Sequence, residues 1–269
     1  MNSKLIQKAR FSGRFVNFLL HSGNRYRVHS PFLYSLIGEV IRVDKPAEGG
    51  EEIEMIRQEC MKSKEIINKT DYGNGADNNP FITYPIALHR IAKTSLTSPR
   101  YARRLYRLSR FLKADRILEI GTSLGITTAY LASGNPKARI ITLEGCPELS
   151  RRAKEHFNRL GLKNIEVIEG RFEDTLLKAL DRLETVDLVF IDGNHRKEAM
   201  LDYYEKCLPH SNNDTVMVFD DIHASAGMEK GWELIRQKQE VRISLDFFFH
   251  GWIFLRKEST KEDFRLRYI

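Results

Sequence analysis

The chain has 269 residues, 42% of them hydrophobic and 10% aromatic, so it can bury the core of a globular protein. This composition excludes an intrinsically disordered chain, and no apolar run approaches the ~20 residues of a membrane-spanning helix. Residues 1–14 lack the apolar core of a signal peptide. The three cysteines, Cys60, Cys146 and Cys207, are isolated in sequence, which predicts neither a zinc site nor a disulfide framework and favours the cytoplasm.

The net charge of +7 is concentrated in two segments. Residues 1–30 carry six basic residues and no acid, and residues 90–116 carry nine basic residues and one acid, so the remainder is net acidic. Such segments either bind an anionic partner, such as nucleic acid or a membrane surface, or form solvated helix faces. Both interpretations stay open at this point.

The N-terminal 95 residues predict helices and no strand. Apolar residues mixed with basic ones indicate an amphipathic helix over 4–20, and another helix is expected over 51–68. Between them, Ser30 followed by a proline is a typical helix start. Residues 70–80 are dense in turn formers and predict a connecting loop. We therefore expect a helical segment over 1–95 that covers the site and selects the substrate.

From residue 96 onward, short apolar runs alternate with helical stretches. The expected strands are Arg116–Ile120, Arg139–Leu143, Ile165–Ile168, Asp187–Ile191, Thr215–Phe219, Arg242–Phe248 and Trp252–Leu255. One helix is expected to begin at Pro99. Further helices are expected over 124–133, 147–160, 173–183, 196–207 and 226–239. This alternation predicts an α/β domain over 96–269 with a Rossmann-like, seven-stranded, mostly parallel sheet. The connection before the final strand is too short for a parallel crossover, so that strand should be antiparallel.

Ligands of open α/β sheets bind beyond the carboxyl ends of the strands. The loop after the first strand reads Glu119-Ile120-Gly121-Thr122-Ser123-Leu124-Gly125. Ser123 stands where a pyrophosphate-binding loop needs its middle glycine, which disfavours a dinucleotide. Glu119 instead suits a ligand with a cationic group. Glu144 ends the second strand, where an acid is positioned to bind both hydroxyls of a ribose.

These residues resemble the first motifs of class I S-adenosylmethionine-dependent methyltransferases, and the resemblance runs from about residue 95 to 255. Ile191-Asp192-Gly193-Asn194-His195 and Val218-Phe219-Asp220-Asp221-Ile222-His223 resemble metal-dependent small-molecule O-methyltransferases within that class. The resemblance also implies that Arg171 and Phe172 lie along the adenine, although an acid is usual near position 171. The expected cofactor-binding residues are Glu119, Gly121, Thr122, Ser123, Gly125, Glu144, Gly145, Arg171, Phe172 and Asp192.

Three acids follow neighbouring strands: Asp192 after the fourth, and Asp220 with Asp221 after the fifth. Carboxylates grouped at adjacent strand ends repel one another unless they are protonated or bridged by a cation. An all-oxygen ligand set favours Mg²⁺ or another hard divalent cation, which would lower the pKa of a substrate hydroxyl. The resemblance implies the same three ligands. Alternatively, Asp220 or Asp221 only caps the following helix.

The general base is less defined. Relatives of this kind carry an acid where this chain has Asn194, and an amide cannot take up a proton. His195 and His223 titrate near neutrality and are the candidate bases, with Asp192 as the third expected catalytic residue.

The sequence therefore predicts methyl transfer from S-adenosylmethionine to the oxygen of a sugar or phenol-like small molecule, assisted by a divalent metal. A nucleic-acid methyltransferase and a non-catalytic cofactor-binding protein are the alternatives. Nucleic acid is disfavoured as a partner because no amino-methylating motif is found and the basic residues lack interleaved aromatics. A homo-oligomer is compatible with the sequence, which does not determine the oligomeric state.

Overall fold

The computed structural model describes residues 3–23, 30–43, 45–72 and 81–267, with side chains from residue 11 onward. The chain packs as two compact units, residues 1–42 with 187–269, and residues 43–186. We call the first the terminal unit and the second the central unit. The functional division expected at residue 95 stays a prediction.

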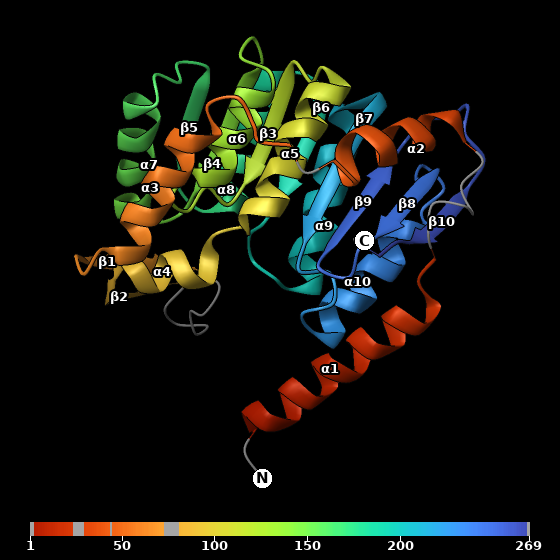
Figure 1. The fold of residues 1–269 in the computed structure, drawn as a ribbon, viewed down its shortest axis with the longest axis horizontal. Helices are drawn as coiled ribbons and strands as arrows, with labels where there is room; N and C mark the ends of the chain where they lie inside the picture. Colours follow the sequence, from red (N-terminus) through yellow and green to blue (C-terminus); the bar gives the residue numbers. More distant parts are fainter. Residues whose placement is uncertain (1–2, 24–29, 44, 73–80, 268–269) are drawn as a thin grey trace. The chain divides into compact units, whose positions relative to one another are not determined.

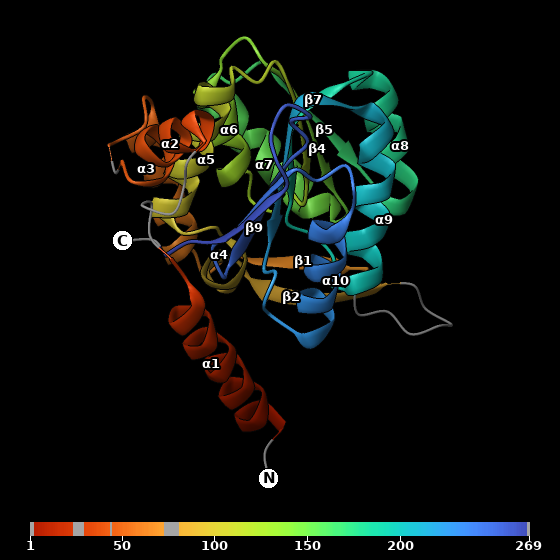
Figure 2. The same ribbon diagram turned by 90° about the vertical axis from the view of Figure 1, so that its right-hand side faces the viewer.

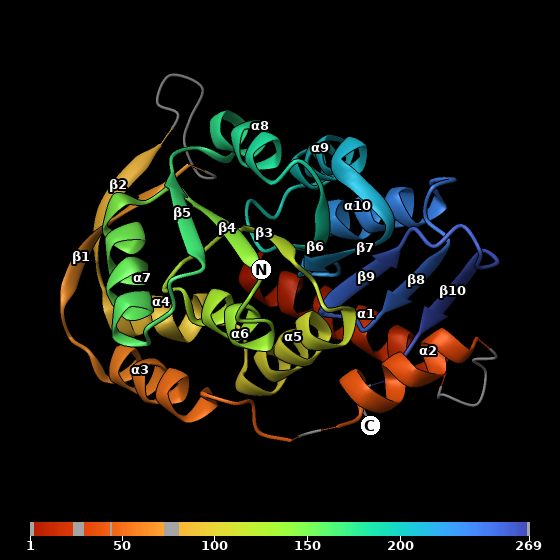
Figure 3. The same ribbon diagram turned by 90° about the horizontal axis from the view of Figure 1, so that it is seen from above.

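The central unit contains α3 (Gly50–Lys62), β1 (Ile66–Asp71), β2 (Ile82–Ala87), α4 (Leu88–Ser95), α5 (Pro99–Leu112), β3 (Arg116–Ile120), α6 (Ile126–Gly134), β4 (Arg139–Glu144), α7 (Pro147–Arg159), β5 (Ile165–Glu169) and α8 (Phe172–Leu183). Strands β3, β4 and β5 are parallel. Helix α8 lies on one face of these strands, and α6 and α7 lie on the other (Figure 3). This is the βαβ arrangement that the alternating pattern predicts.

The expectation of an N-terminal part without strands is wrong. The predicted helix over 51–68 ends at Lys62, and β1 then pairs antiparallel with β2, placing Ile66 opposite Ala87. The ribbon formed by β1 and β2 lies beside α4 (Figure 2). Two consecutive β-branched residues at the start of β1 favour a strand over a further helical turn. Most of the predicted 70–80 loop lies outside the described residues.

The basic helix α5 is only in part the solvated face considered from the sequence, because Arg100 and Arg110 are exposed whereas two other arginines are buried. Arg104 and Arg107 are only 4% and 8% exposed, and Arg107 Nη1 donates to the carbonyl of Lys45 at 3.2 Å. The helix also packs closely on α6, since a Cβ at Gly134 would lie 2.5 Å from the carbonyl oxygen of Tyr106. Two of the five arginines of α5 thus belong to the interior.

The terminal unit contains α1 (Ser3–His21), α2 (Pro31–Leu36), the π-helical turn η2 (Ile37–Ile41), β6 (Val186–Ile191, whose first residue belongs to the central unit), α9 (Lys197–Cys207), the 3₁₀ turn η3 (Leu208–His210), β7 (Ser211–Asp220), α10 (Ala226–Gln237), β8 (Ile243–Asp246), β9 (His250–Phe254) and β10 (Glu262–Arg265). The Ser30 hydroxyl caps α2 by accepting from the Leu33 amide at 3.5 Å, which confirms the predicted helix start.

Strands β10, β8, β9, β7 and β6 follow one another in this order within the terminal unit, and β3, β4 and β5 do so within the central unit (Figure 1). Strand β9 is antiparallel to both β7 and β8, which confirms the direction expected for the final predicted strand. The sequence prediction missed β10, which pairs parallel with β8 at the edge. Its four residues alternate between half-buried and exposed and include a single apolar side chain, so the pattern is too weak to predict a strand.

Helix α1 is held by an aromatic cluster around Phe248. The ring centroids of Phe11, Phe15 and Phe18 lie 5.2, 4.9 and 5.5 Å from that of Phe248. These three residues are spaced by four and three positions, so they share one face of the helix. His223 stacks on Phe248 with ring centroids 5.0 Å apart. Aromatic packing thus joins the N-terminal helix to the β8–β9 connection.

All three cysteines are free and buried. Burial raises the pKa of Cys60 to about 11 and that of Cys207 to about 12, so both thiols are protonated near neutral pH. Cys146 Sγ donates to the Asn68 carbonyl at 3.6 Å and accepts from the Thr70 amide at 3.4 Å. The absence of a disulfide between these three residues agrees with the sequence expectation.

Gly251 on β9 gives a test of the packing in the terminal unit. A Cβ there would lie 2.6 to 2.8 Å from three atoms of the Trp232 ring, so Gly251→Ala should destabilise the protein by about 1–3 kcal/mol in urea unfolding. Gly13→Ala is the control, because Gly13 is helical with open space around it and should gain about 0.5–1 kcal/mol. Equal stabilities for Gly251→Ala and the wild type would contradict this packing.

Candidate functional site

The turn between β3 and α6 is built for close backbone approach. Gly121, Ser123 and Gly125 have φ angles of 106°, 49° and 74°, so two of the three left-handed positions are glycine. The amides of Gly121 and Thr122 donate to the Leu143 carbonyl at 3.0 and 3.1 Å. The turn is therefore fixed to the end of β4.

Glu144, the last residue of β4, completes this loop. Its Oε2 accepts from the Ser123 amide at 2.7 Å and its Oε1 accepts from the Cys146 amide at 2.8 Å. Burial raises the pKa of Glu144 to about 7, although these backbone hydrogen bonds act to lower it. The Gly145 amide is a further backbone donor to this side chain. Of the roughly four lone-pair positions of a carboxylate, at least one thus stays open to a ligand hydroxyl.

Glu119 lies beneath the turn rather than in it. Its side chain is fully buried, and Oε2 accepts hydrogen bonds from the hydroxyls of Thr128 and Thr142, the latter at 2.6 Å. Thr142 also bonds the Thr122 hydroxyl at 2.6 Å. Burial raises the pKa of Glu119 to about 7, and its Oε1 has no hydrogen-bond partner in the described part of the chain.

The remaining expected cofactor residues of the central unit follow β4 and β5. Gly145 packs closely on Tyr72, because a Cβ there would lie 2.8 Å from Cδ2 of that ring. Arg171 precedes α8, and its side chain is 43% exposed with Nε 3.7 Å from Glu173 Oε2. Phe172 is the first residue of α8 and is half-buried.

The expected acids of the terminal unit interact with one another. The side chains of Asp192 and Asp220 lie close enough to share a hydrogen bond, which requires a proton on one of the two carboxyl groups. Burial alone would raise the pKa of Asp220, but the neighbouring His250 and the bond to Asp192 hold it below its ordinary value. Burial, followed by the charge of Asp220, raises the pKa of Asp221. The carboxylates expected to lie close together therefore influence each other electrostatically.

His250 is a site residue that the sequence analysis missed. It stands opposite Asp220 in the β7–β9 ladder, with its Nδ1 2.5 Å from Asp220 Oδ1. At this distance the imidazole and the carboxylate are in direct contact, and His250 acts to lower the pKa of Asp220. Only the strand register reveals this pair, and the sequence analysis placed His250 in the connection between two strands.

The acids do not form a ready metal centre in this arrangement. Within the described residues, no group of three or more His, Cys, Asp or Glu side chains is placed to hold a metal ion. Asp192 and Asp220 bond each other, and Asp220 contacts His250. The three expected ligands do not, as they stand, fit a common cation.

The two candidate bases differ in their surroundings. His195 is 41% exposed, and its Nε2 lies 3.7 Å from Asp192 Oδ1. His223 is buried between two carboxylates, with Nδ1 3.2 Å from Glu229 Oε1 and Nε2 3.0 Å from Asp246 Oδ2. Because both ring nitrogens of His223 face carboxylates, neither is directed at a substrate in this arrangement. This geometry favours His195.

Sequence comparisons match this part of the chain to methyltransferases. Residues 118–222 match the family model of a methyltransferase domain. A catechol O-methyltransferase of Mycobacterium tuberculosis is 34% identical over 124 residues, 44% of this chain and 52% of the relative. Another from Niastella koreensis is 30% identical over 46% of this chain and 57% of the relative. The resemblance to class I S-adenosylmethionine-dependent O-methyltransferases is confirmed. The matches span only about half the length of these curated relatives.

Solved structures extend the likeness of the fold. An O-methyltransferase from Bacillus cereus in complex with SAH has a TM-score of 0.52 and 26% identity over 60% of this chain and 83% of that chain. An SAH-bound Podospora anserina methyltransferase has a TM-score of 0.55 at 19% identity, covering 79% of this chain and 99% of that chain. The Rossmann-like fold is thereby confirmed. The described residues hold no helix that is long and apolar enough to cross a membrane.

The raised pKa of Glu119 predicts a pH-dependent stability. The folded protein binds this proton more tightly than the unfolded chain, so the contribution to stability is present below the usual pKa of 4.5 and is lost as pH rises through about 7. Glu119→Gln removes this dependence. In urea unfolding, the stability of the variant relative to wild type should rise by up to about 3 kcal/mol between about pH 4 and pH 8.

Glu52→Gln is the control, because Glu52 is an exposed acid in α3. Glu144 titrates in both proteins and its charge adds to the raised pKa of Glu119, so the difference between them reports Glu119 together with this coupling. A stability difference that stays constant over this pH range would contradict the assignment.

Proposed function

We propose that this chain transfers a methyl group from S-adenosylmethionine to an oxygen of a small-molecule acceptor. The observation that carries the proposal is the β3–α6 turn, which contains two left-handed glycines and whose Ser123 amide donates to the carboxylate of Glu144. A catechol-like or other phenolic hydroxyl is the acceptor class we propose, because two curated relatives are named catechol O-methyltransferase.

The residues of the central unit fit the cofactor. Glu144 would accept a hydrogen bond from a ribose hydroxyl on its remaining lone-pair position, and the two glycines supply the left-handed conformations that the turn needs. The unpartnered Glu119 Oε1 supports a role in the same region, with Glu119 holding the turn from below. When bound, S-adenosylmethionine supplies an electrophilic methyl group on a sulfonium. Methyl transfer then depends mainly on the alignment of donor and acceptor.

The chain's own acid–base chemistry lies in the terminal unit. We propose His195 as the group that takes up the proton of the acceptor hydroxyl, since it is accessible and its Nε2 faces Asp192. Asp192 would orient the imidazole and stabilise its charged form. His223 would act as a positioning residue that holds the loop after β7. The divalent metal stays a prediction, and no step of this reaction depends on it.

The alternative of a nucleic-acid methyltransferase loses support from α5. Phosphate binding needs accessible cations, whereas Arg104 and Arg107 are buried and the exposed Arg110 pairs with Glu48. The alternative of a non-catalytic protein rests on Asn194, which stands where relatives carry an acid. The structure gives Asn194 a φ of 49° in the loop after β6. Asparagine tolerates this left-handed conformation, so Asn194 has a conformational role that does not require the loss of activity. The location in the cytoplasm stays a proposal.

Cofactor binding is the first test. S-adenosylhomocysteine should bind with micromolar affinity in calorimetry, and NAD should not bind. Glu144→Ala should weaken binding by about 1–3 kcal/mol, because buried ribose hydroxyls would lose their acceptor. Glu148→Ala is the matched control, since it removes a nearby acid from the first turn of α7. Binding of NAD without binding of S-adenosylhomocysteine would refute the proposal.

The metal prediction has a separate test. If a divalent cation bridges Asp192, Asp220 and Asp221, EDTA should abolish methyl transfer to a catechol panel, and Mg²⁺ or Mn²⁺ should restore it. Asp221→Asn should then remove most turnover while leaving the affinity for S-adenosylhomocysteine nearly unchanged. Full activity after chelation would mean that the acids serve only their histidine partners, with His195 acting alone on the acceptor.

A further inference from the structure

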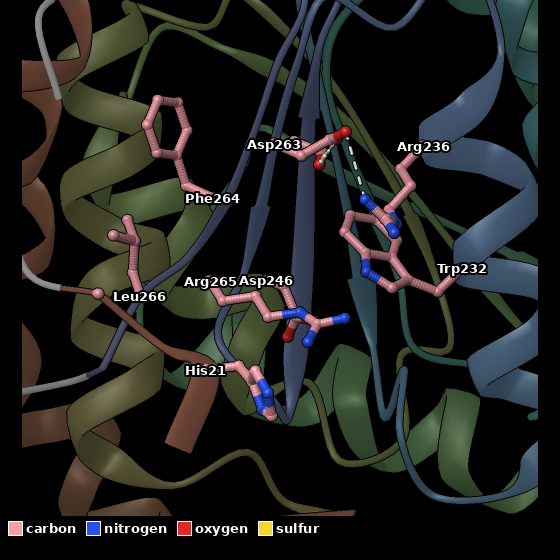
Figure 4. Close-up of a pocket in the computed structure, with 10 residues that line it drawn as sticks. His21, Trp232, Arg236, Asp246, Asp263, Phe264, Arg265 and Leu266 are labelled. Atoms are coloured by element: carbon pink, nitrogen blue, oxygen red, sulfur yellow. Dashed lines mark hydrogen bonds and ion pairs between the residues drawn. The ribbon is translucent and has the colours of Figure 1, made fainter. Parts of the chain in front are cut away.

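The terminal unit contains a second feature, a cavity of about 310 Å³ that the proposed reaction does not use. Its floor is formed by Ser244 and Asp246 of β8 with Asp263 and Arg265 of β10, and Trp232 and Arg236 of α10 form one wall (Figure 4). His21, at the end of α1, also lines it. This volume is at the lower end of the range of small-molecule pockets.

Strand register explains why polar side chains gather here. In the β8–β10 ladder, Ser244 stands opposite Asp263 and Asp246 stands opposite Arg265, so all four side chains point to one face. Trp232 and Arg236 are four residues apart and share one face of α10. The face of β8 and β10 that lines the cavity thus carries two acids and an arginine.

The acceptor atoms of the cavity are already occupied. Asp246 Oδ1 accepts from the Phe248 amide at 2.8 Å, and Oδ2 accepts from His223 Nε2 at 3.0 Å. Asp263 Oδ1 accepts from the Ser244 hydroxyl, and Oδ2 lies 3.2 Å from Arg236 Nη1. All four carboxylate oxygens therefore have a protein partner.

Two hydrogen-bond donors at the cavity, the Trp232 indole and the Arg265 guanidinium, are less well paired than these acceptor oxygens. The Trp232 side chain is 2% exposed, yet its Nε1 has no hydrogen-bond partner among the described residues. Figure 4 shows this indole nitrogen turned toward the side chain of Arg265. Arg265 is 40% exposed, and its Nε lies 3.9 Å from Asp246 Oδ2, which is beyond hydrogen-bond distance. A buried indole N–H without an acceptor costs about 1–3 kcal/mol, and an acceptor atom supplied by a ligand would remove this cost.

We propose that this cavity binds the oxyanion of a small molecule, a carboxylate or a phosphate, between the Trp232 indole N–H and the Arg265 guanidinium. A planar guanidinium can donate two parallel hydrogen bonds to such a group, and the indole supplies a third donor. His21 Nδ1 bonds the Asn17 carbonyl at 2.8 Å, which leaves Nε2 at the cavity as a further contact. The proposal does not depend on methyl transfer.

The indole N–H provides a direct measurement. The chain has two tryptophans, so a ¹H–¹⁵N spectrum should show two indole signals, and Trp232→Phe assigns one of them. Phenyl phosphate and benzoate should shift the Trp232 signal saturably with a Kd of about 1 mM or tighter, whereas neutral phenol should not. The tighter of the two anions identifies the oxyanion. Arg265→Gln should weaken binding roughly tenfold or more.

Lys257→Gln is the control, because it removes an exposed cation of the same unit outside the cavity lining. It should leave the affinity unchanged. Three results would overturn the proposal: no shift with either anion at ~10 mM, equal binding of phenol, or unchanged affinity in Arg265→Gln. The thermal unfolding midpoint of each variant shows that a loss of binding is not a loss of folding.

Discussion

The candidate cofactor loop depends on one buried carboxylate, that of Glu144. Its two oxygens accept from the amides of Ser123 and Cys146, which belong to the loops after β3 and β4. Without this acceptor both amides would be left unpaired, and the turn that places Ser123 at a φ of 49° would lose its anchor. One side chain therefore fixes the relative position of two loops and also faces the proposed ligand.

Local pattern was sufficient to predict the central strands. Arg116–Ile120 is found as predicted, because five consecutive residues with a buried apolar majority end at a glycine turn. The ribbon of β1 and β2 and the edge strand β10 were not predicted, since their residues alternate weakly and pairing with a partner strand determines their conformation. Edge and hairpin strands depend on contacts that are distant in sequence.

The same limit applies to the candidate site. Glu144 and the acids after β6 and β7 follow strand ends and could be predicted from position alone. The contact between His250 and Asp220 arises from cross-strand register, and the engagement of both nitrogens of His223 arises from Glu229 and Asp246 on separate elements. Each aspartate–histidine contact lowers the cost of a buried charge, which local sequence cannot reveal.

The burial of the three cysteines has a practical consequence for spectroscopy and labelling. Reagents that modify thiols attack the thiolate at accessible positions, and the described structure offers Cys60, Cys146 and Cys207 only in the interior. The wild-type chain thus provides a nearly silent background for maleimide chemistry. A single cysteine placed on the surface would therefore carry a fluorophore or spin label selectively, without the removal of any native thiol.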